Sequence, residues 1–456
     1  MDAKERICDY IDANAGIFTG AADYIWAHPE LSLQEFEAAK LYISLLREHG
    51  FTVTEKLGGI DTAFCGSYGS GRPVIGILGE FDALDRMSQR GGVTERQELV
   101  PDGAGHGCGH HLLGAGALGA AFAVKDWLEQ SGAPGTVVFY GCPGEEGGSG
   151  KAFLAREGLW KELDAAITWH PGDCNEVRSG TNNSSIQVLY RFTGVASHAA
   201  QAPEAGRSAL DAVELMNMGV QFLREHMDSS CRVHYAITDA GGLSPNVVQA
   251  RAAVLYMVRG IQVSQSLRLL ERVDKIAQGA ALMTETELER IFIDGTAELM
   301  PNFTLEQLLQ EAMEAVGAPV FTAGEQRYAA ALRSTYAPDT QGDALESGIR
   351  PLCSTEAFSP GSTDVGDVSQ LCPASQITTV TFPVAAPGHS WQNVACGTTS
   401  IAHKGMLFAA KALALSAQRL LSEPETLAAI QAEFARRSSV HGYLCPIPAD
   451  AVPTII

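Results

Sequence analysis

The sequence is poor in positive charge and contains no long hydrophobic run. Its 32 lysines and arginines face 53 aspartates and glutamates, which gives a formal net charge of −21. The average field of such a chain repels phosphate backbones and anionic membrane surfaces, so nucleic acid is not an expected partner. No segment approaches the roughly 18 uninterrupted apolar residues of a membrane span. The N-terminus also lacks the basic stretch and apolar run of a secretory signal. We therefore expect a cytoplasmic protein that does not enter a membrane.

The cysteines are too scattered to suggest a disulfide framework. Ten cysteines are spread over 456 residues, with no secretory signal to place them in an oxidising compartment. Most should be free thiols that are buried as small apolar residues, with Cys108 as the exception. The sequence also has no internal repeat and no low-complexity linker. Because one hydrophobic core stops growing at roughly 250–300 residues, we expect at least two domains.

Short apolar runs alternate with helical patterns in the first and last parts of the chain. Residues 36–49 place apolar groups at helical spacing, and a helix rich in small apolar residues begins near Leu112 and closes at Gly132. Strand-like apolar runs occupy residues 74–78, 136–140, 165–168 and 377–382. Strands that alternate with helices predict an α/β domain built on a largely parallel or mixed sheet.

The pattern changes between about residues 181 and 301. Strand and helical periodicities follow one another there in the order β-α-β-α-β. We interpret residues 183–301 as a smaller α/β sandwich inserted into a larger domain that is formed by residues 1–182 and 302–456. The polar stretch near residues 320–350 has no readable pattern, and we expect loops there that form part of a pocket wall.

Polar side chains that could bind metal or move protons follow four of the predicted strands. Asp82 follows the first strand, Glu145 and Glu146 follow the second, His170 the third and His389 the fourth. In open α/β sheets, ligands bind outside the carboxyl ends of the strands. We therefore expect these groups to converge on one crevice.

A glycine-rich segment, GHGCGHH at residues 105–111, adds Cys108 and His110. Their spacing suits a loop in which alternate side chains turn toward one ion. The combined donors are one thiolate, one carboxylate and three imidazoles, a set that suits Zn²⁺, Mn²⁺ or Co²⁺ better than Ca²⁺ or Mg²⁺. They exceed what one open tetrahedral site uses, so two ions that share a bridging ligand are favoured. Of the adjacent acids Glu145 and Glu146, one can bind metal while the other transfers protons.

The chain resembles a known family along essentially its whole length. It is similar to the M20 metallopeptidases, in the amidohydrolase branch with a CGH metal motif. The resemblance implies a two-domain M20-type fold, with a central mostly parallel sheet and an inserted lid and dimerisation domain, and hence a homodimer formed through residues 183–301. The motifs that carry it are HPELSLQEFEAAK, GEFDAL, GHGCGHHLLGAG, GCPGEEGGSGK, SHAAQAPEAGRSALDAVELMN, GGLSPNVVQA, GSTDVGDVS and PGHS.

The resemblance also implies roles for individual residues. Glu145 would be the general base, and Asp82 would orient a ligand. The usual CGHD continues here as CGHH, so His111 replaces the acid and receives no role. The implied ligands of the two metal ions are Cys108, His110, Glu146, His170 and His389.

Three residues of the inserted segment resemble residues that contact substrate in this family. His198 resembles a histidine that reaches across a dimer to polarise the scissile carbonyl. Asn246 and Arg259 resemble residues that hold the substrate, and an arginine suits a carboxylate through two parallel hydrogen bonds.

The expected function is metal-dependent hydrolysis of the amide bond of an N-acyl amino acid. The motifs are most similar to those of enzymes that act on p-aminobenzoyl-glutamate, so this compound or a similar aroyl or acyl amino acid is the expected substrate. One alternative is a dipeptidase for β-alanyl or basic dipeptides. Another is a catalytically silent binding protein, or a subunit that depends on a second, different chain.

Overall fold

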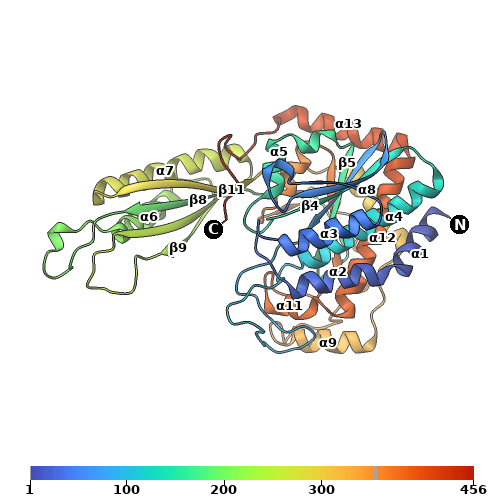
Figure 1. Ribbon diagram of the computed structural model, residues 1–456, viewed down its shortest axis with the longest axis horizontal. Coiled ribbons are helices and arrows are strands. Elements are labelled where there is room, and N and C mark those ends of the chain that lie inside the picture. Colours follow the sequence, from blue (N-terminus) through green and yellow to red (C-terminus); the bar gives the residue numbers. More distant parts are fainter. Residues whose placement is uncertain (1, 354–356, 456) are drawn as a thin grey trace.

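A seven-stranded mixed sheet forms the centre of the larger of two bodies in the computed structural model, which describes residues 2–353 and 357–455 (Figure 1). Its strands are β1 (Thr52–Glu55), β2 (Phe64–Ser70), β3 (Val74–Glu80), β4 (Gly135–Cys142), β5 (Ala165–Gly172), β6 (Glu176–Arg178) and β13 (Ala374–Val380). They lie in the order β1-β2-β4-β3-β5-β13-β6. The four neighbouring strands β4, β3, β5 and β13 are parallel, and β2 and β6 run antiparallel beside them. This arrangement confirms the predicted α/β class with a mostly parallel sheet.

Helices cover both faces of this sheet. The helices of the larger body are α1 (Ala3–Ala13), α2 (Ala15–Ala27), α3 (Phe36–Glu48), α4 (His110–Ser131), α5 (Gly150–Arg156), α8 (Phe303–Val316), α9 (Ala323–Arg333), α10 (Val365–Ser369), α11 (Trp391–Cys396), α12 (Ser400–Ser422) and α13 (Pro424–His441), with 3-10 turns η1 (Leu57–Gly59) and η2 (Leu159–Glu162). The long helices α4 and α12 pack against each other and against the sheet. The short helices α5 and α10 lie on the opposite face.

The alternation of side chains along β4 explains why both faces are covered. Val137 and Phe139 belong to the core under α4 and α12, whereas Val138 and Tyr140 belong to the core under α5. Because successive side chains of a strand point to opposite faces, an uninterrupted apolar run must be buried on both sides.

Helix α4 lies directly behind the carboxyl end of β3, and glycine makes the close approach possible. A Cβ atom at Gly114 would lie 2.4 Å from the hydroxyl of Tyr42 and 2.7 Å from the carbonyl oxygen of Glu80. Overpacking of this kind typically costs about 1–3 kcal/mol. The small residues of this helix therefore set how near its first turn comes to the strand ends.

The second body is an elongated unit that projects from the first (Figure 1). Its strands are β8 (Ser184–Thr193), β9 (Arg232–Asp239), β10 (Arg251–Gly260) and β11 (Glu287–Thr296), and its helices are α6 (Ala209–Arg224) and α7 (Val263–Thr284), with the 3-10 turn η3 (Pro203–Ala205). The sheet is antiparallel in the order β11-β8-β10-β9. We call this unit, β8 to β11, the inserted unit. Two further short strands, β7 (Thr181–Asn182) and β12 (Phe358–Ser359), pair with each other.

Four details of the sequence interpretation were wrong. The inserted unit contains β9, which the predicted order β-α-β-α-β lacks because the side chains of this strand are mostly exposed and show no apolar alternation. The stretch near residues 320–350 includes helix α9, which a Thr322–Glu325 capping box starts. The third strand, β5, continues to Gly172, and α4 begins at His110 rather than near Leu112.

The division of the chain at residues 183 and 301 stays a prediction. No disulfide joins any of the ten cysteines, all of which lie in the described part of the chain. Among the described helices, none is both long and apolar enough to cross a bilayer.

Candidate active site and metal centre

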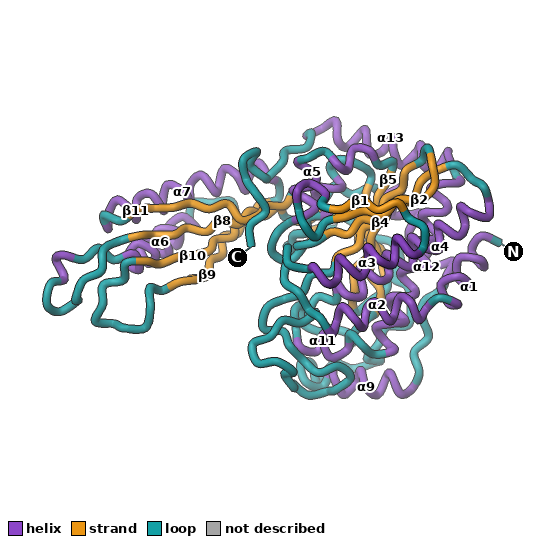
Figure 2. The backbone as a smooth tube through the Cα atoms, in the orientation of Figure 1, coloured by secondary structure: helices purple, strands orange, loops and turns teal. Residues whose placement is uncertain are grey.

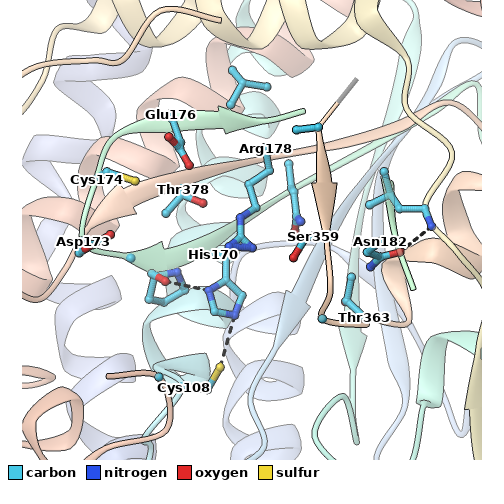
Figure 3. Close-up of a pocket in the computed structure, with 18 of the residues that line it drawn as sticks. Cys108, His170, Asp173, Cys174, Glu176, Arg178, Asn182, Ser359, Thr363 and Thr378 are labelled. Atoms are coloured by element: carbon cyan, nitrogen blue, oxygen red, sulfur yellow. Dashed lines mark hydrogen bonds between the residues drawn. The ribbon is translucent and has the colours of Figure 1, made fainter. Parts of the chain in front are cut away.

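A cleft of about 710 Å³ lies outside the carboxyl ends of β3, β4, β5 and β13, where the sequence predicts one. The parallel strands bring their carboxyl ends to one edge of the sheet, which is why residues far apart in the chain meet there. Part of the cleft is drawn in Figure 3, with His170 at its centre. Among its lining residues are Glu80, Cys108, Glu145, Glu146, His170, Arg178 and His389.

Cys108 and His110 enter the cleft through a turn that only glycine accommodates. Gly109 between them has φ +88°, a backbone conformation that side-chain-bearing residues rarely adopt, and a Cβ atom there would lie 2.9 Å from Pro171. Because His110 is the first residue of α4, the pair spans a turn and a helix start rather than the expected loop. The Sγ atom of Cys108 lies 3.4 Å from Nε2 of His170 (Figure 3).

Asp82 sets the orientation of His110. Its Oδ1 atom lies 2.7 Å from Nδ1 of His110, and its Oδ2 atom accepts from the backbone N–H of Glu146 and the hydroxyl of Ser32. Burial raises the pKa of Asp82, but His110 outweighs burial and holds the pKa at about 2. When Nδ1 donates to this carboxylate, Nε2 presents its lone pair to the cleft, as a metal-binding histidine requires.

The donor atoms fit two cations. Cys108, His110 and His170 form one group of three whose ligand atoms lie within 4.8 Å of one another, and Cys108, Glu146 and His389 form another. A thiolate common to both groups is what two neighbouring ions with a shared ligand require. Nε2 of His110 and Oε1 of Glu146 are buried without a hydrogen-bond partner in the described part of the chain. Such unsatisfied atoms typically cost about 1–3 kcal/mol each unless a ligand completes them.

Glu145 belongs to neither of these two groups but to a third, with Glu80 and His110, whose ligand atoms also lie within 4.8 Å of one another. Its carboxylate is 3.9 Å from Nε2 of His110, and its side chain is 14% exposed. Burial, reinforced by the nearby charges of Glu80 and Glu146, raises the pKa of Glu145 well above its usual range. A carboxyl with a raised pKa holds a proton more readily than an ordinary glutamate, which suits a group that both accepts and donates a proton.

His389 reaches the site from a strained loop. Its φ of +53° lies in the left-handed region, which histidine occupies at a cost, and such strain persists where surrounding structure holds it. Its side chain is 52% exposed, with Nε2 3.5 Å from Oε2 of Glu146. His389 is therefore the most accessible member of the predicted ligand set.

Three residues that the sequence interpretation missed form a buried ion cluster behind the donors. Lys151 is fully buried, and its Nζ atom lies 2.7 Å from Oε1 of Glu80 and 2.5 Å from Oδ1 of Asp364. The other oxygen of Glu80 lies 3.3 Å from Nε2 of His110. Burial lowers the pKa of Lys151, but the adjacent carboxylates outweigh it and raise the pKa well above its usual range. A signal was present, because Glu80 ends the first strand and the other two lie in GCPGEEGGSGK and GSTDVGDVS.

The side chain of His111, which replaces the usual acid, contacts the backbone of a segment far away in the sequence. Its Nε2 atom lies 3.1 Å from the carbonyl oxygen of Gly397, and its ring packs 4.9 Å from that of His106. Burial, together with His106, lowers the pKa of His111 well below its usual range, so the imidazole is neutral. It ties the start of α4 to the segment before α12.

The predicted substrate residues of the inserted unit do not line the cleft of their own chain. His198 and Asn246 are exposed and lie on adjacent loops, joined by the hydrogen bond from the backbone N–H of Ala199 to the carbonyl of Asn246. Both loops are at the end of the inserted unit farthest from the central sheet (Figure 2). Arg259 is nearer, because its Nη1 atom donates to the hydroxyl of Ser362, a residue of the cleft wall.

A comparison with known proteins finds relatives along the whole chain. The family model described as Peptidase family M20/M25/M40 matches residues 76–390. The chain is 44% identical to one of the subunits of p-aminobenzoyl-glutamate hydrolase of Escherichia coli K12, over 98% of each chain. It is 26% identical to the Xaa-Arg dipeptidase of Mus musculus, over 94% of this chain and 92% of that one. Among solved structures, a dinuclear metal-binding M20 peptidase of Bacillus subtilis superposes with a TM-score of 0.56 at 19% identity, covering 90% of this chain and 99% of that one.

Proposed function

Because the chain belongs to peptidase family M20/M25/M40, we propose that it hydrolyses the amide bond of p-aminobenzoyl-glutamate or a similar aroyl amino acid. The chain is a hydrolase that acts on amide bonds. The aroyl-glutamate substrate is supported by the name of the Escherichia coli relative, with which the chain shares almost its full length.

The observation that carries the proposal is the pair of donor groups that share Cys108, with Glu145 beside them. The chain binds divalent metal ions, and we propose Mn²⁺ or Zn²⁺, or Co²⁺, held by Cys108, His110, Glu146, His170 and His389. Metal ions bound there would polarise the amide carbonyl and make water a stronger nucleophile.

The protein's own side chains would carry the proton transfers. Glu145 would take a proton from the attacking water and pass it to the departing amine, which its raised pKa suits. Asp82 would hold His110 in one tautomer through the 2.7 Å contact. The buried position of Glu145 keeps its carboxyl within the cleft and largely away from bulk water.

We further propose that the active unit is a homodimer joined through the inserted unit. His198 lies at the far end of that unit, so it can complete a cleft only on another chain. Strand β9 is one of the two outer strands of the four-stranded sheet and exposes Tyr235 and Ile237. On α6, Met218 and Phe222 are exposed on adjacent turns of the same face. An unpaired strand edge beside an apolar stripe is suited to pairing with a second copy.

Two other functions are open to experiment. The mouse relative is named a dipeptidase specific for Xaa-Arg, which favours a basic dipeptide as the second candidate substrate. The Escherichia coli relative is named as one subunit of an enzyme, so activity that depends on a different chain is the third candidate. A cytoplasmic location stays a prediction.

The test is to purify this chain alone, load it with Mn²⁺ or Zn²⁺, and measure hydrolysis of p-aminobenzoyl-glutamate beside Xaa-Arg and β-alanyl dipeptides. We expect p-aminobenzoate and glutamate to be released with the highest kcat/KM. Preference for a dipeptide would support the second candidate. Inactivity of the metal-loaded chain on every substrate would reject catalysis by this chain alone.

A further inference from the structure

One cationic side chain of the cleft has no hydrogen-bond or ion-pair partner among the residues that the structure describes. Arg178 lines the cleft, and its guanidinium makes no hydrogen bond or ion pair with any residue that the structure describes. The strand explains its direction, because Val177 belongs to the core on the side of β6 that α8 contacts and its neighbours in β6 must point to the opposite side. Glu176 and Arg178 thus both face the cleft.

The other arginine of the cleft is already neutralised. Arg350 lies 3.1 Å from the carboxylate of Glu176 and 2.8 Å from that of Glu346. Arg178 is therefore the single lysine or arginine among the described lining residues that keeps its charge free. An exposed arginine that lines a cleft without a carboxylate partner is open to bind an anion.

The register of the sheet places this guanidinium beside the candidate metal centre. Thr378 of β13 lies opposite His170 on one side and Glu176 on the other, so β6 is two strands away from His170. In Figure 3 the Arg178 side chain extends from β6 toward the ring of His170, with Ser359 on its other side. A group bound to Arg178 would lie next to the reacting amide rather than at a remote surface.

We propose that Arg178 binds the side-chain carboxylate of the substrate's amino acid and makes the enzyme selective for N-acyl derivatives of acidic amino acids. The proposal rests on the proposed function and names the amino acid that the cleft selects. Arg259, which is expected to hold the α-carboxylate, lies on the inserted unit and donates to the neutral hydroxyl of Ser362. Two guanidinium groups, Arg178 in the cleft and Arg259 behind Ser362 of its wall, match the two carboxylates of a glutamyl or aspartyl residue.

The same placement disfavours a basic side chain. A substrate whose amino acid carries a positive charge would bring that charge toward an unpaired guanidinium beside the metal ions, and like charges in a partly enclosed cleft repel. The free charge of Arg178 therefore discriminates between an acyl-glutamate and an Xaa-Arg dipeptide.

The experiment compares the charged substrate with its neutral isostere. Wild type and Arg178→Gln are assayed on p-aminobenzoyl-glutamate and p-aminobenzoyl-glutamine. Loss of a charged pair of hydrogen bonds should raise KM for the glutamate substrate by about 10- to 100-fold while the glutamine substrate changes little. Arg178→Lys keeps the positive charge but loses the paired N–H donors of the guanidinium. It should recover part of the preference for the glutamate substrate over the glutamine substrate. Arg350→Gln is the matched control and should change both substrates by the same factor.

A binding measurement separates failure of this proposal from failure of the proposed function. Calorimetry on the metal-loaded protein should find L-glutamate bound more tightly than L-glutamine by wild type, with the difference absent in Arg178→Gln. Equal binding by wild type, or a preference that survives in Arg178→Gln, overturns the proposal whether or not the chain turns over either substrate. A preference that depends on Arg178 in a protein inactive on both amides supports it and rejects the proposed reaction.

Discussion

Replacing Lys151 with methionine should destabilise the larger body strongly. The lysine is fully buried and is the common partner of two carboxylates, those of Glu80 and Asp364, which are 3% and 0% exposed. Methionine fills a similar volume but leaves both carboxylates without their cation. Removal of one partner from a buried ion pair typically costs about 3–5 kcal/mol, because the remaining charge is stranded in a medium of low polarity. Two stranded charges place the expected loss at the upper end of this range.

The origin of the loss can be tested by removing the stranded charges. In a triple variant that adds Glu80→Gln and Asp364→Asn, the site becomes neutral and much of the lost stability should return. The single variant should also recover partly as the pH falls, since protonation neutralises buried carboxylates. Urea unfolding followed by tryptophan fluorescence gives the free energies, and Trp160, which packs in the core near Lys151, is a suitable reporter. A loss below about 1 kcal/mol in the single variant, or a triple variant no more stable than it, would refute the reasoning.

Three further outcomes are expected. Glu145→Gln should bind metal normally, as measured by metal analysis, but lose about 10²- to 10⁴-fold in kcat, because the group that moves the proton is gone. Asp367 accepts from the backbone N–H of Ala297 and from the Tyr443 hydroxyl, and burial raises its pKa to about 8. An aspartate in the unfolded chain has a pKa of about 3.9, so between about pH 4 and pH 8 the folded state keeps a proton on Asp367 that the unfolded state has lost. The free energy of unfolding should therefore fall as pH rises from about 4 to 8, by up to about 1.4 kcal/mol per pH unit. Asp367→Asn should remove this part of the slope in urea unfolding at a series of pH values. If the proposed homodimer forms through the inserted unit, Phe222→Glu should give a monomer in light scattering and reduce activity.

Each of these variants has a control and a contradicting result. Near-normal kcat in Glu145→Gln would reject that residue as the base. An unchanged slope in Asp367→Asn would mean that other groups set the pH dependence. For the dimer, Val320→Glu places the same charge on an exposed apolar residue of the larger body, where Val320 is 83% exposed, and should leave the mass unchanged. A Phe222→Glu protein that keeps the mass of wild type would place the interface elsewhere.

Much of the fold could be predicted because its signals are local. The apolar strands and the long buried helix after Cys108 carry their periodicity within ten to twenty residues, and the α/β class predicted from them is confirmed. The family, which was inferred from short motifs, is also confirmed. Strand β9 was not predicted because it is an outer strand with exposed side chains on both faces, so its sequence shows no alternation of apolar and polar residues. Helix α9 was not predicted because its apolar residues pack on a small separate core rather than along a continuous face.

The residues of the candidate site likewise differ in how far the sequence alone can identify them. Glu146 and His170 are recognisable from their residue types and from their positions after predicted strands, and Cys108 from its place in a glycine-rich Cys/His segment. The roles inferred for them stay predictions. His198 illustrates the limit, since a sequence suggests its participation but a single chain places it far from its own cleft.

The sequence by itself determined the chemical types at the strand ends, the class of fold and the family, because each depends on short stretches of chain and on the rule that parallel strands end at one edge. Only the tertiary structure decided which charges are paired. Lys151 and Asp364 are 213 positions apart and meet behind Glu80. Arg350 is neutralised by Glu176 and Glu346, whereas Arg178 is left open toward the cleft. Ion pairing depends on separations of a few ångströms between distant segments, and no local periodicity records those separations.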